Sequence, residues 1–236
     1  MKPLDKKERS EIFKMFLDTR RLKFNEIEKR LGIRLGIRSN MVSYHLTSMV
    51  KDNFLEKKGD YYHLTKDAEK YIPIFSQLYG QELGPLPVIL VAVMHAKNIL
   101  LIKRNKRPYK DYWSMIGGKI SMHENYREAS LRKVFERTRL GAEFVSLNNI
   151  LHEHVEESGT VKHSFILIFT KVNSKRLKFR QTAAGELKWF SIDKLPEKII
   201  PSDIWLIKHS LNTKMRIPRM RMRESDGIIE SYTMID

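Results

Sequence analysis

The chain has 236 residues, 42% of them hydrophobic and 31% charged, which is a globular profile with enough length for two domains. It contains no cysteine, so disulfides, thiolate metal sites and thiol nucleophiles are excluded. The net charge of +16 favours polyanionic partners without choosing among them. The longest apolar run, from Leu86 to Met94, is too short to span a membrane and no leader opens the chain, so we expect a cytoplasmic protein with no membrane partner.

Two short helices are predicted near the N-terminus. Apolar residues recur at helical spacing over residues 12–17 and again over 24–31. Gly32 is a natural C-terminal cap, so the second helix is expected to end there. The segment 31–34 is repeated at once as 35–38, which lengthens the following turn and either adds a helical turn or tilts the next helix.

A third helix is predicted after Ser39, which is a good N-cap residue. Its buried stripe consists of Val42, Leu46, Met49 and Val50, at positions i, i+4, i+7 and i+8. The opposite face carries hydroxyl, amide and amino groups suited to base edges and phosphates in a DNA major groove. The predicted DNA-contacting residues of this face are Ser39, Asn40, Ser43, Tyr44, Thr47 and Lys51.

A β-hairpin is predicted next, because the segments 54–58 and 61–64 flank the turn-forming pair Gly59-Asp60. Lys57 and Lys58 lie beside the tip of this hairpin, and we expect both to contact DNA.

Together these elements resemble the ArsR-type winged helix-turn-helix domains of bacteria and archaea. The resemblance covers residues 7–72 and is clearest in the run 39–46. It implies that the third helix enters a major groove of double-stranded DNA and that the hairpin is the wing. The alternative is a winged helix used only for protein contacts or dimerisation.

The boundary between the two domains is predicted at Gly84-Pro85-Leu86-Pro87, because glycine and proline interrupt both regular structures. Before it, Thr65 caps a bridging helix that we expect to run from Lys66 to about Leu83, kinked or split by Pro73. The predicted organisation is a DNA-binding domain with its bridging helix over residues 1–83, a linker over 84–87, a second domain over 88–212 and a basic C-terminal β-hairpin over 213–236.

The second domain is predicted to begin with a buried β-hairpin formed by the apolar runs 88–93 and 99–102. The pair Gly117-Gly118 follows, and it permits a tight turn and close approach of the backbone to a ligand. Six positions after Gly118, Glu124 opens an amphipathic helix that contains Arg132, with its apolar residues at Ala129, Leu131, Val134 and Phe135.

This region resembles a Nudix domain over residues 86–200. The Nudix box reads G-x5-E-x7-R-E-U-x-E-E-x-G-U, where U is a bulky apolar residue, and the matching residues are Gly118, Glu124, Arg132, Val134, Glu136 and Leu140. The resemblance implies an α/β/α sandwich around a mixed sheet, so the chain is expected to be an α+β multidomain protein. Nudix enzymes hydrolyse nucleoside diphosphates linked to another moiety, with Mg²⁺ held by the box glutamates.

The box is altered at the residues that hold the metal. Lys133 and Arg137 replace two of its glutamates, and Arg139 replaces its glycine. Positions 133, 136 and 137 share one helix face, so their summed charge changes from −3 to +1 and repels a divalent metal. The same cations are suited to bind a diphosphate directly, so we expect no cofactor and no catalytic residue. The predicted ligand-binding residues are Arg104, Gly117, Gly118, Lys119, Arg132, Lys133, Glu136 and Arg137.

Two functions remain open on the sequence. The first is a homodimeric, DNA-binding transcription regulator whose Nudix-like domain binds a phosphorylated nucleotide or sugar effector without hydrolysing it, as in Nudix-related regulators but with the domain order reversed. The second is a Nudix hydrolase that uses Mg²⁺, with Glu136 as a metal ligand. The other carboxylates available for recruitment are Glu143, Glu153, Glu156, Glu157 and Glu186. A third interpretation of the altered helix is a solvated cationic face in which Lys133 pairs with Glu136.

A second hairpin is predicted at the C-terminus around Ser225-Asp226-Gly227. One of its strands carries arginines at positions 219, 221 and 223 on one face and Met220 and Met222 on the other. This pattern suits a dimer contact or a phosphate-facing edge, and we favour the dimer because winged-helix regulators read two half-sites.

Overall fold

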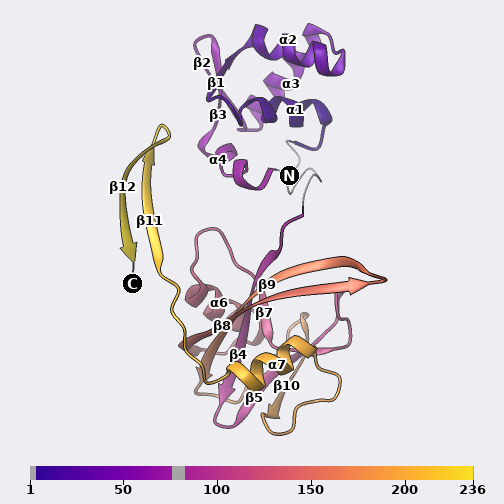
Figure 1. Ribbon diagram of the computed structural model, residues 1–236, viewed down its shortest axis with the longest axis vertical. Helices are drawn as coiled ribbons and strands as arrows, with labels where there is room; N and C mark the ends of the chain where they lie inside the picture. Colours follow the sequence, from indigo (N-terminus) through magenta and orange to yellow (C-terminus); the bar gives the residue numbers. More distant parts are fainter. Residues whose placement is uncertain (1–3, 76–82, 236) are drawn as a thin grey trace. The chain divides into compact units, whose positions relative to one another are not determined.

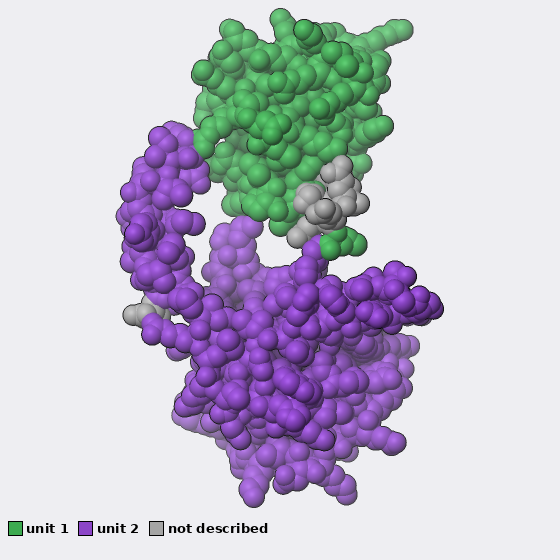
Figure 2. All heavy atoms as spheres, viewed as in Figure 1, with its two compact units in different colours: residues 1–83 green, residues 84–236 purple. Residues whose placement is uncertain are grey.

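The computed structural model describes residues 4–75 and 83–235. The chain divides into two compact units, Met1–Leu83 and Gly84–Asp236, which we call unit 1 and unit 2 (Figure 2). In the described part of the chain, no helix is both long enough and apolar enough to cross a membrane.

Unit 1 combines α-helices with a small antiparallel sheet (Figure 1). The sheet has the strand order β1-β3-β2, and β2 and β3 form a hairpin. The elements in chain order are α1 (Lys7–Met15), β1 (Arg21–Lys23), α2 (Phe24–Leu35), α3 (Ser39–Lys51), β2 (Leu55–Lys58), β3 (Tyr61–Leu64) and α4 (Lys66–Glu69).

The core of unit 1 follows the apolar periodicity of its helices, with two exceptions. Val42, Leu46 and Met49 of α3 are buried together with apolar residues of α1 and α2. Val50, which was predicted to be buried, is exposed because it lies at the edge of this stripe, and His45 occupies the buried position instead. Leu17 is also exposed, since α1 ends at Met15 and Leu17 lies in the turn beyond it.

The second helix does not stop at Gly32, as predicted, but continues to Leu35. Gly36 takes the left-handed conformation at its end, with φ 64°, and donates its backbone N–H to the carbonyl of Gly32 at 3.0 Å. Both glycines belong to the repeated segment, and the second one caps the helix because the chain turns only there. The repeat therefore adds one turn to α2.

The predicted bridging helix is interrupted soon after it begins. Thr65 caps α4 by accepting the backbone N–H of Ala68 at 3.2 Å, and a short 3-10 helix, Ile72–Ile74, follows. Pro73 lies within that 3-10 helix, where its missing N–H and fixed φ end the regular hydrogen-bonding pattern. The remainder of the prediction falls on residues 76–82, outside the described residues.

Unit 2 is built on a mixed seven-stranded sheet, which confirms the predicted mixed α+β fold (Figure 1). Its main path is β10-β5-β4-β9-β8, with β6 paired to β5 and β7 to β4. The pair β4–β9 is parallel and the other pairs are antiparallel. The elements are β4 (Leu86–His95), β5 (Asn98–Arg104), β6 (Trp113–Ser114), β7 (Ile116–Lys119), α6 (Tyr126–Thr138), β8 (Ala142–Glu157), β9 (Thr160–Ser174), β10 (Gly185–Ser191) and α7 (Pro201–Ser210).

The two helices of unit 2 cover opposite faces of this sheet. Ile89, Val91 and Val93 of β4 pack in one apolar core with α6. The alternating residues of the same strand pack in a second core with Leu206 and Ile207 of α7. Strand β4 is apolar throughout because both of its faces are buried.

Two predicted boundaries in unit 2 are wrong by a few residues. Strand β4 begins at Leu86, inside the predicted linker, because Leu86 and Pro87 already pair with β9. Proline is tolerated there because β7 pairs with β4 only from Val88 onward, so that side of Pro87 requires no N–H. Helix α6 begins at Tyr126 after the N-cap Asn125, so Glu124 precedes the helix instead of opening it.

The predicted burial of one apolar residue of α6 is also wrong. Phe135 was predicted to face the core, but it is exposed because Val134 occupies the buried side of that turn.

The chain ends in a two-stranded hairpin of β11 (Arg219–Ser225) and β12 (Ile228–Ile235). Met220 lies opposite Met234 and Met222 opposite Tyr232. Cross-strand partners share a face, so one face of the hairpin is apolar and the alternate positions place arginines on the other.

Candidate ligand-binding site

A cavity of about 570 Å³ opens in unit 2, a volume within the usual range for small-molecule sites. Strands β4 and β9 contribute apolar walls, and β7 and the loop between β5 and β6 contribute polar ones. The cations that line this cavity are Arg104, Lys106, Arg107, Lys119 and Arg137.

Arg104 and Arg137 place two positive charges close together in this cavity. Burial lowers the pKa of Arg104 below its ordinary value, and Asp203 and Tyr109 oppose this effect, whereas the charge of Arg137 adds to it. The Nε of Arg104 donates to the carbonyl of Pro108 at 2.9 Å, which anchors the guanidinium. Two neighbouring guanidinium groups in a partly dry site favour an anionic ligand.

The same cavity contains an acidic group of side chains. The hydroxyl of Tyr109 donates to Oε1 of Glu153 at 3.0 Å, and the backbone N–H of Met115 donates to Oδ2 of Asp203 at 2.5 Å. Asp203 is 2% exposed, and burial raises its pKa to about 7, with Glu153 adding to the effect and the Met115 N–H and Arg104 opposing it. Burial, followed by Glu153, also raises the pKa of the Tyr109 phenol.

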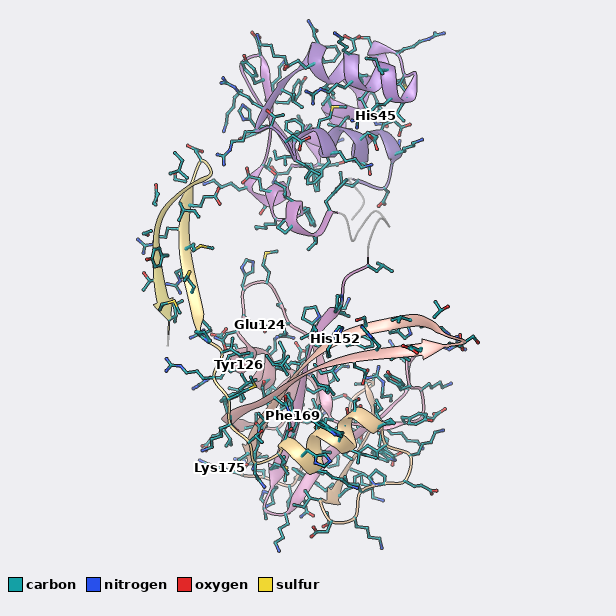
Figure 3. All side chains as sticks on the ribbon, in the orientation of Figure 1. His45, Glu124, Tyr126, His152, Phe169 and Lys175 are labelled. Atoms are coloured by element: carbon teal, nitrogen blue, oxygen red, sulfur yellow. The ribbon has the colours of Figure 1, made fainter. Side chains whose placement is uncertain are left out.

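The retained acids of the Nudix box are engaged by Arg132 (Figure 3 labels Glu124 beside the start of α6). Its Nε donates to Glu124 Oε2 at 2.6 Å and its second terminal nitrogen donates to Oε1 of the same carboxylate. Its first terminal nitrogen donates to Glu136 at 2.9 Å, and Lys133 donates to the other oxygen of Glu136 at 3.1 Å. The hydrogen bonds from Arg132 hold the pKa of Glu124 down to about 2 and lower that of Glu136.

These side chains do not fit the Mg²⁺ that the Nudix resemblance implies. Hard divalent cations require several oxygen ligands, whereas both box acids here are neutralised by Arg132 and Lys133. Over residues 4–75 and 83–235, no group of three or more His, Asp or Glu side chains is placed to hold a metal ion.

The eight predicted ligand-binding residues separate into two groups. Arg104, Gly117, Gly118, Lys119 and Arg137 line the cavity. The other three, Arg132, Lys133 and Glu136, do not line it and instead form the ion-pair cluster with Glu124.

The glycine pair was predicted to permit a tight turn, but Gly117 and Gly118 lie within strand β7. A Cβ at Gly117 would lie 2.3 Å from the carbonyl oxygen of Ile89, and one at Gly118 would lie 3.0 Å from Cε of Lys133. Gly118 also has φ 152°. The packing of β7 against β4 and α6 therefore explains why this strand carries two glycines.

The cavity residues that were not predicted as ligand-binding residues include the hydrogen-bonded polar side chains of Tyr109, Glu153 and Asp203. Glu153 was considered only as a substitute metal ligand. Asp203 lies in the first turn of α7, where an acidic residue is ordinarily explained by the helix dipole. Its hydrogen bond comes from the distant residue Met115, and no local sequence signal indicates this contact.

In unit 1, the residues predicted to contact DNA are all exposed. Six lie on α3 and two on β2, next to the turn at Gly59. Lys58 pairs with Glu56 at 2.6 Å, and the ammonium of Lys57 lies 5.6 Å from the ring centre of Tyr62. The ammonium of Lys6 lies 5.4 Å from the ring centre of Tyr44, which adds a cation beside the exposed face of α3.

Comparison with known proteins identifies the family of unit 2. The NUDIX domain family model matches residues 84–209, more than half of the chain, so the chain belongs to the NUDIX family. A comparison with curated proteins gives no match.

Similar solved structures include the MutT protein of Bacillus halodurans, with 22% identity, 63% of this chain and 96% of that chain covered, and a TM-score of 0.47. The MutT NUDIX hydrolase of Burkholderia pseudomallei has 21% identity over 53% of this chain and 97% of its own, with a TM-score of 0.47. The NUDIX domain of Shewanella oneidensis NrtR, solved with ADP-ribose, has 16% identity over 56% of this chain and 93% of its own, with a TM-score of 0.44.

Proposed function

We propose that this protein is a DNA-binding transcription regulator whose NUDIX domain binds an anionic nucleotide or phosphosugar without hydrolysing it. The observation that carries the proposal is the position of Arg137. It occupies an acidic position of the NUDIX box, and it lines the cavity beside Arg104. A cation at this position attracts the phosphates that a metal would otherwise neutralise.

The ion pairs of Arg132 support the proposal that the altered NUDIX box does not bind Mg²⁺. For Mg²⁺ to bind, Glu124 and Glu136 would have to exchange hydrogen-bonded cations for the ion, and Lys133 and Arg137 would remain as repelling charges. The net charge at the box therefore opposes the family's hydrolytic route.

Unit 1 supports DNA binding as a winged helix-turn-helix. Helix α3 packs its apolar side inward and presents Asn40, Ser43, Tyr44 and Thr47 to solvent, and the β2–β3 hairpin carries exposed lysines. We propose that α3 enters the major groove, that the hairpin is the wing and that a homodimer reads two half-sites.

The ligand half of the proposal is tested by titrating pyrophosphate, ADP and ribose 5-phosphate into the full chain by calorimetry, with either EDTA or Mg²⁺. Binding is expected to be equally tight in both buffers. Arg137→Glu restores the acidic charge and is expected to weaken pyrophosphate binding in EDTA at least tenfold. Arg127→Glu makes the same charge change at an exposed position of α6 and is the matched control. Binding that requires Mg²⁺ would contradict this half.

The alternative, a Mg²⁺-dependent hydrolase, is favoured by membership of the NUDIX family and by the retained Glu124 and Glu136. It predicts Mg²⁺-dependent release of phosphate-containing products from a panel of nucleoside diphosphate derivatives. Turnover at ordinary enzymatic rates, abolished by Glu136→Gln, would establish the hydrolase and reject binding without hydrolysis.

The DNA half is tested by electrophoretic retardation of genomic fragments that include the region upstream of the protein's own gene. Lys51→Glu on the exposed face of α3 is expected to weaken retardation at least tenfold, and Lys66→Glu on α4 is expected to change it less than twofold. Adding a ligand that binds unit 2 should shift DNA affinity, and DNA should shift ligand affinity by the same factor. Absence of retardation at low salt, with and without ligand, would contradict the DNA half.

A further inference from the structure

The cavity of unit 2 contains more than an anion site, because its cations share it with a long apolar wall and a buried carboxyl. The apolar wall includes Val88 and Leu90 from β4 and Phe165 and Leu167 from β9. Phosphate groups gain nothing from these side chains. A ligand that uses the whole cavity therefore has an apolar surface as well as a charged end.

Only one oxygen of the Asp203 carboxyl is hydrogen-bonded within the described part of the chain. Oδ2 accepts the backbone N–H of Met115 at 2.5 Å, and among the described residues no hydrogen bond to Oδ1 is found. Asp203 is 2% exposed and lines the cavity. Because Asp203 lines the cavity and its Oδ1 has no partner among the described residues, a donor on a ligand can reach this oxygen without displacing another hydrogen bond.

A planar heterocycle matches these two features better than a sugar does. Its faces are apolar and its polar groups lie at the edge, so it can stack against the apolar wall and still present a donor to Asp203. A sugar carries hydroxyls around its ring, and some of them would be buried without partners against residues such as Leu90 and Leu167.

Building on the proposed function, we propose that the cavity binds a nucleoside phosphate whose base presents an N–H donor, and that Asp203 selects for this donor. The phosphates lie among the cations that include Arg104 and Arg137, and the base lies along the apolar wall. Glu153, held by the hydroxyl of Tyr109, sets the negative potential around Asp203. Asp203 is a specificity-determining residue in this arrangement, and no reaction is assigned to it.

The Asp203→Asn variant tests this assignment with little change in shape. The Asn oxygen can still accept the Met115 N–H, which directs the amide NH₂ to the position of Oδ1 and replaces an acceptor with a donor. Asp193→Asn, in the exposed turn after β10, is the matched control. The affinities of the full chain for ADP, GDP, CDP, UDP, ribose 5-phosphate and pyrophosphate are measured by calorimetry in EDTA at pH 8.5, where Asp203 is ionised and its Oδ1 is an acceptor.

At least one nucleoside diphosphate is expected to bind the native chain tenfold or more tightly than pyrophosphate or ribose 5-phosphate. Asp203→Asn is expected to remove that tenfold advantage and to leave pyrophosphate affinity within twofold, with Asp193→Asn unchanged. Equal weakening of nucleotide and pyrophosphate binding, or no change in either, overturns the role of Asp203. Nucleotides that bind no better than pyrophosphate overturn the inference but leave the proposed anion site intact. Failure of every compound to bind rejects the proposed function itself.

A change in the ligand tests the same contact without any change in the protein. Purine riboside diphosphate lacks the amino group of ADP, and N3-methyl-UDP lacks the N–H of UDP. Whichever parent nucleotide binds better, its analogue is expected to bind the native chain at least tenfold more weakly, because a site built for a donor rejects a ligand without one. Equal affinity of parent and analogue overturns the inference even if Asp203→Asn does not fold.

Discussion

Among the described residues, each unit contains one ionisable side chain that is only 2% exposed, and these two side chains respond to pH in opposite directions. His45 in unit 1 is 2% exposed, and burial lowers its pKa. Asp203 in unit 2 is equally buried, and burial raises its pKa to about 7. Burial favours the neutral form of both groups, but a histidine is neutral at high pH and an aspartic acid at low pH. The stabilities of the two units should therefore separate as pH changes.

The largest effect is expected in unit 2. The folded unit keeps the Asp203 proton at a pH where the unfolded carboxyl, with a pKa near 3.8, has lost it. Stability is therefore full below about pH 4 and is lost as pH rises through about 7, by about 4 kcal/mol at most. All three tryptophans, Trp113, Trp189 and Trp205, lie in unit 2, so their fluorescence during urea unfolding at pH 4 to 8 reports on this unit.

Asp203→Asn removes the titrating group and is expected to flatten this pH dependence, whereas Asp193→Asn is expected to retain it. An identical slope in the native chain and in Asp203→Asn would show that another group titrates in this window.

A smaller effect of opposite sign is expected in unit 1. Because the pKa of folded His45 is below that of the unfolded histidine, its contribution to stability is present above about pH 6.5 and is lost as pH falls. Neither ring nitrogen has a hydrogen-bond partner among the described residues. His45→Leu should therefore stabilise unit 1 by about 1 to 2 kcal/mol at neutral pH and remove the acid-side loss.

Hydrogen exchange of amides in α1 and α3, followed over pH 5 to 8 with its intrinsic pH dependence subtracted, measures the stability of unit 1. His63→Leu on β3 is the control. A native chain in which both units lose stability in the same pH direction would refute the contrast between them.

Two glycines at the end of α2 differ in backbone conformation, and substitutions at them are expected to change the stability of unit 1 by about 1 kcal/mol in opposite directions. Gly32 of α2 and its C-cap residue Gly36 both have nothing within 4 Å of an added Cβ, but only Gly36 has a positive φ. Gly36→Ala should therefore destabilise unit 1 by about 1 kcal/mol through backbone strain. Gly32→Ala should stabilise it by about 0.5 to 1 kcal/mol through helix propensity. Thermal unfolding followed by far-UV circular dichroism compares the two variants, and shifts of the same sign would contradict the assigned end of α2.

The sequence was informative wherever neighbouring residues determine the outcome. The apolar spacing of α3 predicts its buried and exposed sides, and the match to the NUDIX box locates α6 and the altered acids. The predicted end of α2 was wrong because either glycine of the repeat can cap a helix. Which of the two caps it depends on where the chain turns to pack.

The cavity was harder to predict because its residues are brought together by pairing between distant strands. Asp203 and Met115 are hydrogen-bonded although they lie 88 positions apart in the sequence, and Tyr109 and Glu153 are hydrogen-bonded at a separation of 44 positions. The charge reversal at Lys133 and Arg137 is visible in the sequence. Only the structure shows that the two residues have different surroundings. Arg137 lines the cavity, whereas Lys133 lies over Gly118 and pairs with Glu136.

The smallest effect is expected at Arg139, which ends α6 as Gly36 ends α2. Arg139 has φ 59° and donates its backbone N–H to the carbonyl of Phe135 at 2.9 Å, so an arginine occupies the left-handed position that glycine adopts without strain. Arg139→Gly should relieve about 1 kcal/mol of strain. It also removes the guanidinium from the ring of Phe135, whose centre is 5.3 Å away, at a cost of about 0.5 kcal/mol.

The net gain in the stability of unit 2 is expected to be about 0.5 kcal/mol, measured by urea unfolding with tryptophan fluorescence. Arg139→Ala separates the two contributions, because it removes the cation but keeps the Cβ, and it should therefore destabilise. If Arg139→Gly and Arg139→Ala change stability equally, the left-handed backbone costs nothing here. In that case the glycine of the NUDIX box is not needed to end α6, and the contrast with Gly36 fails.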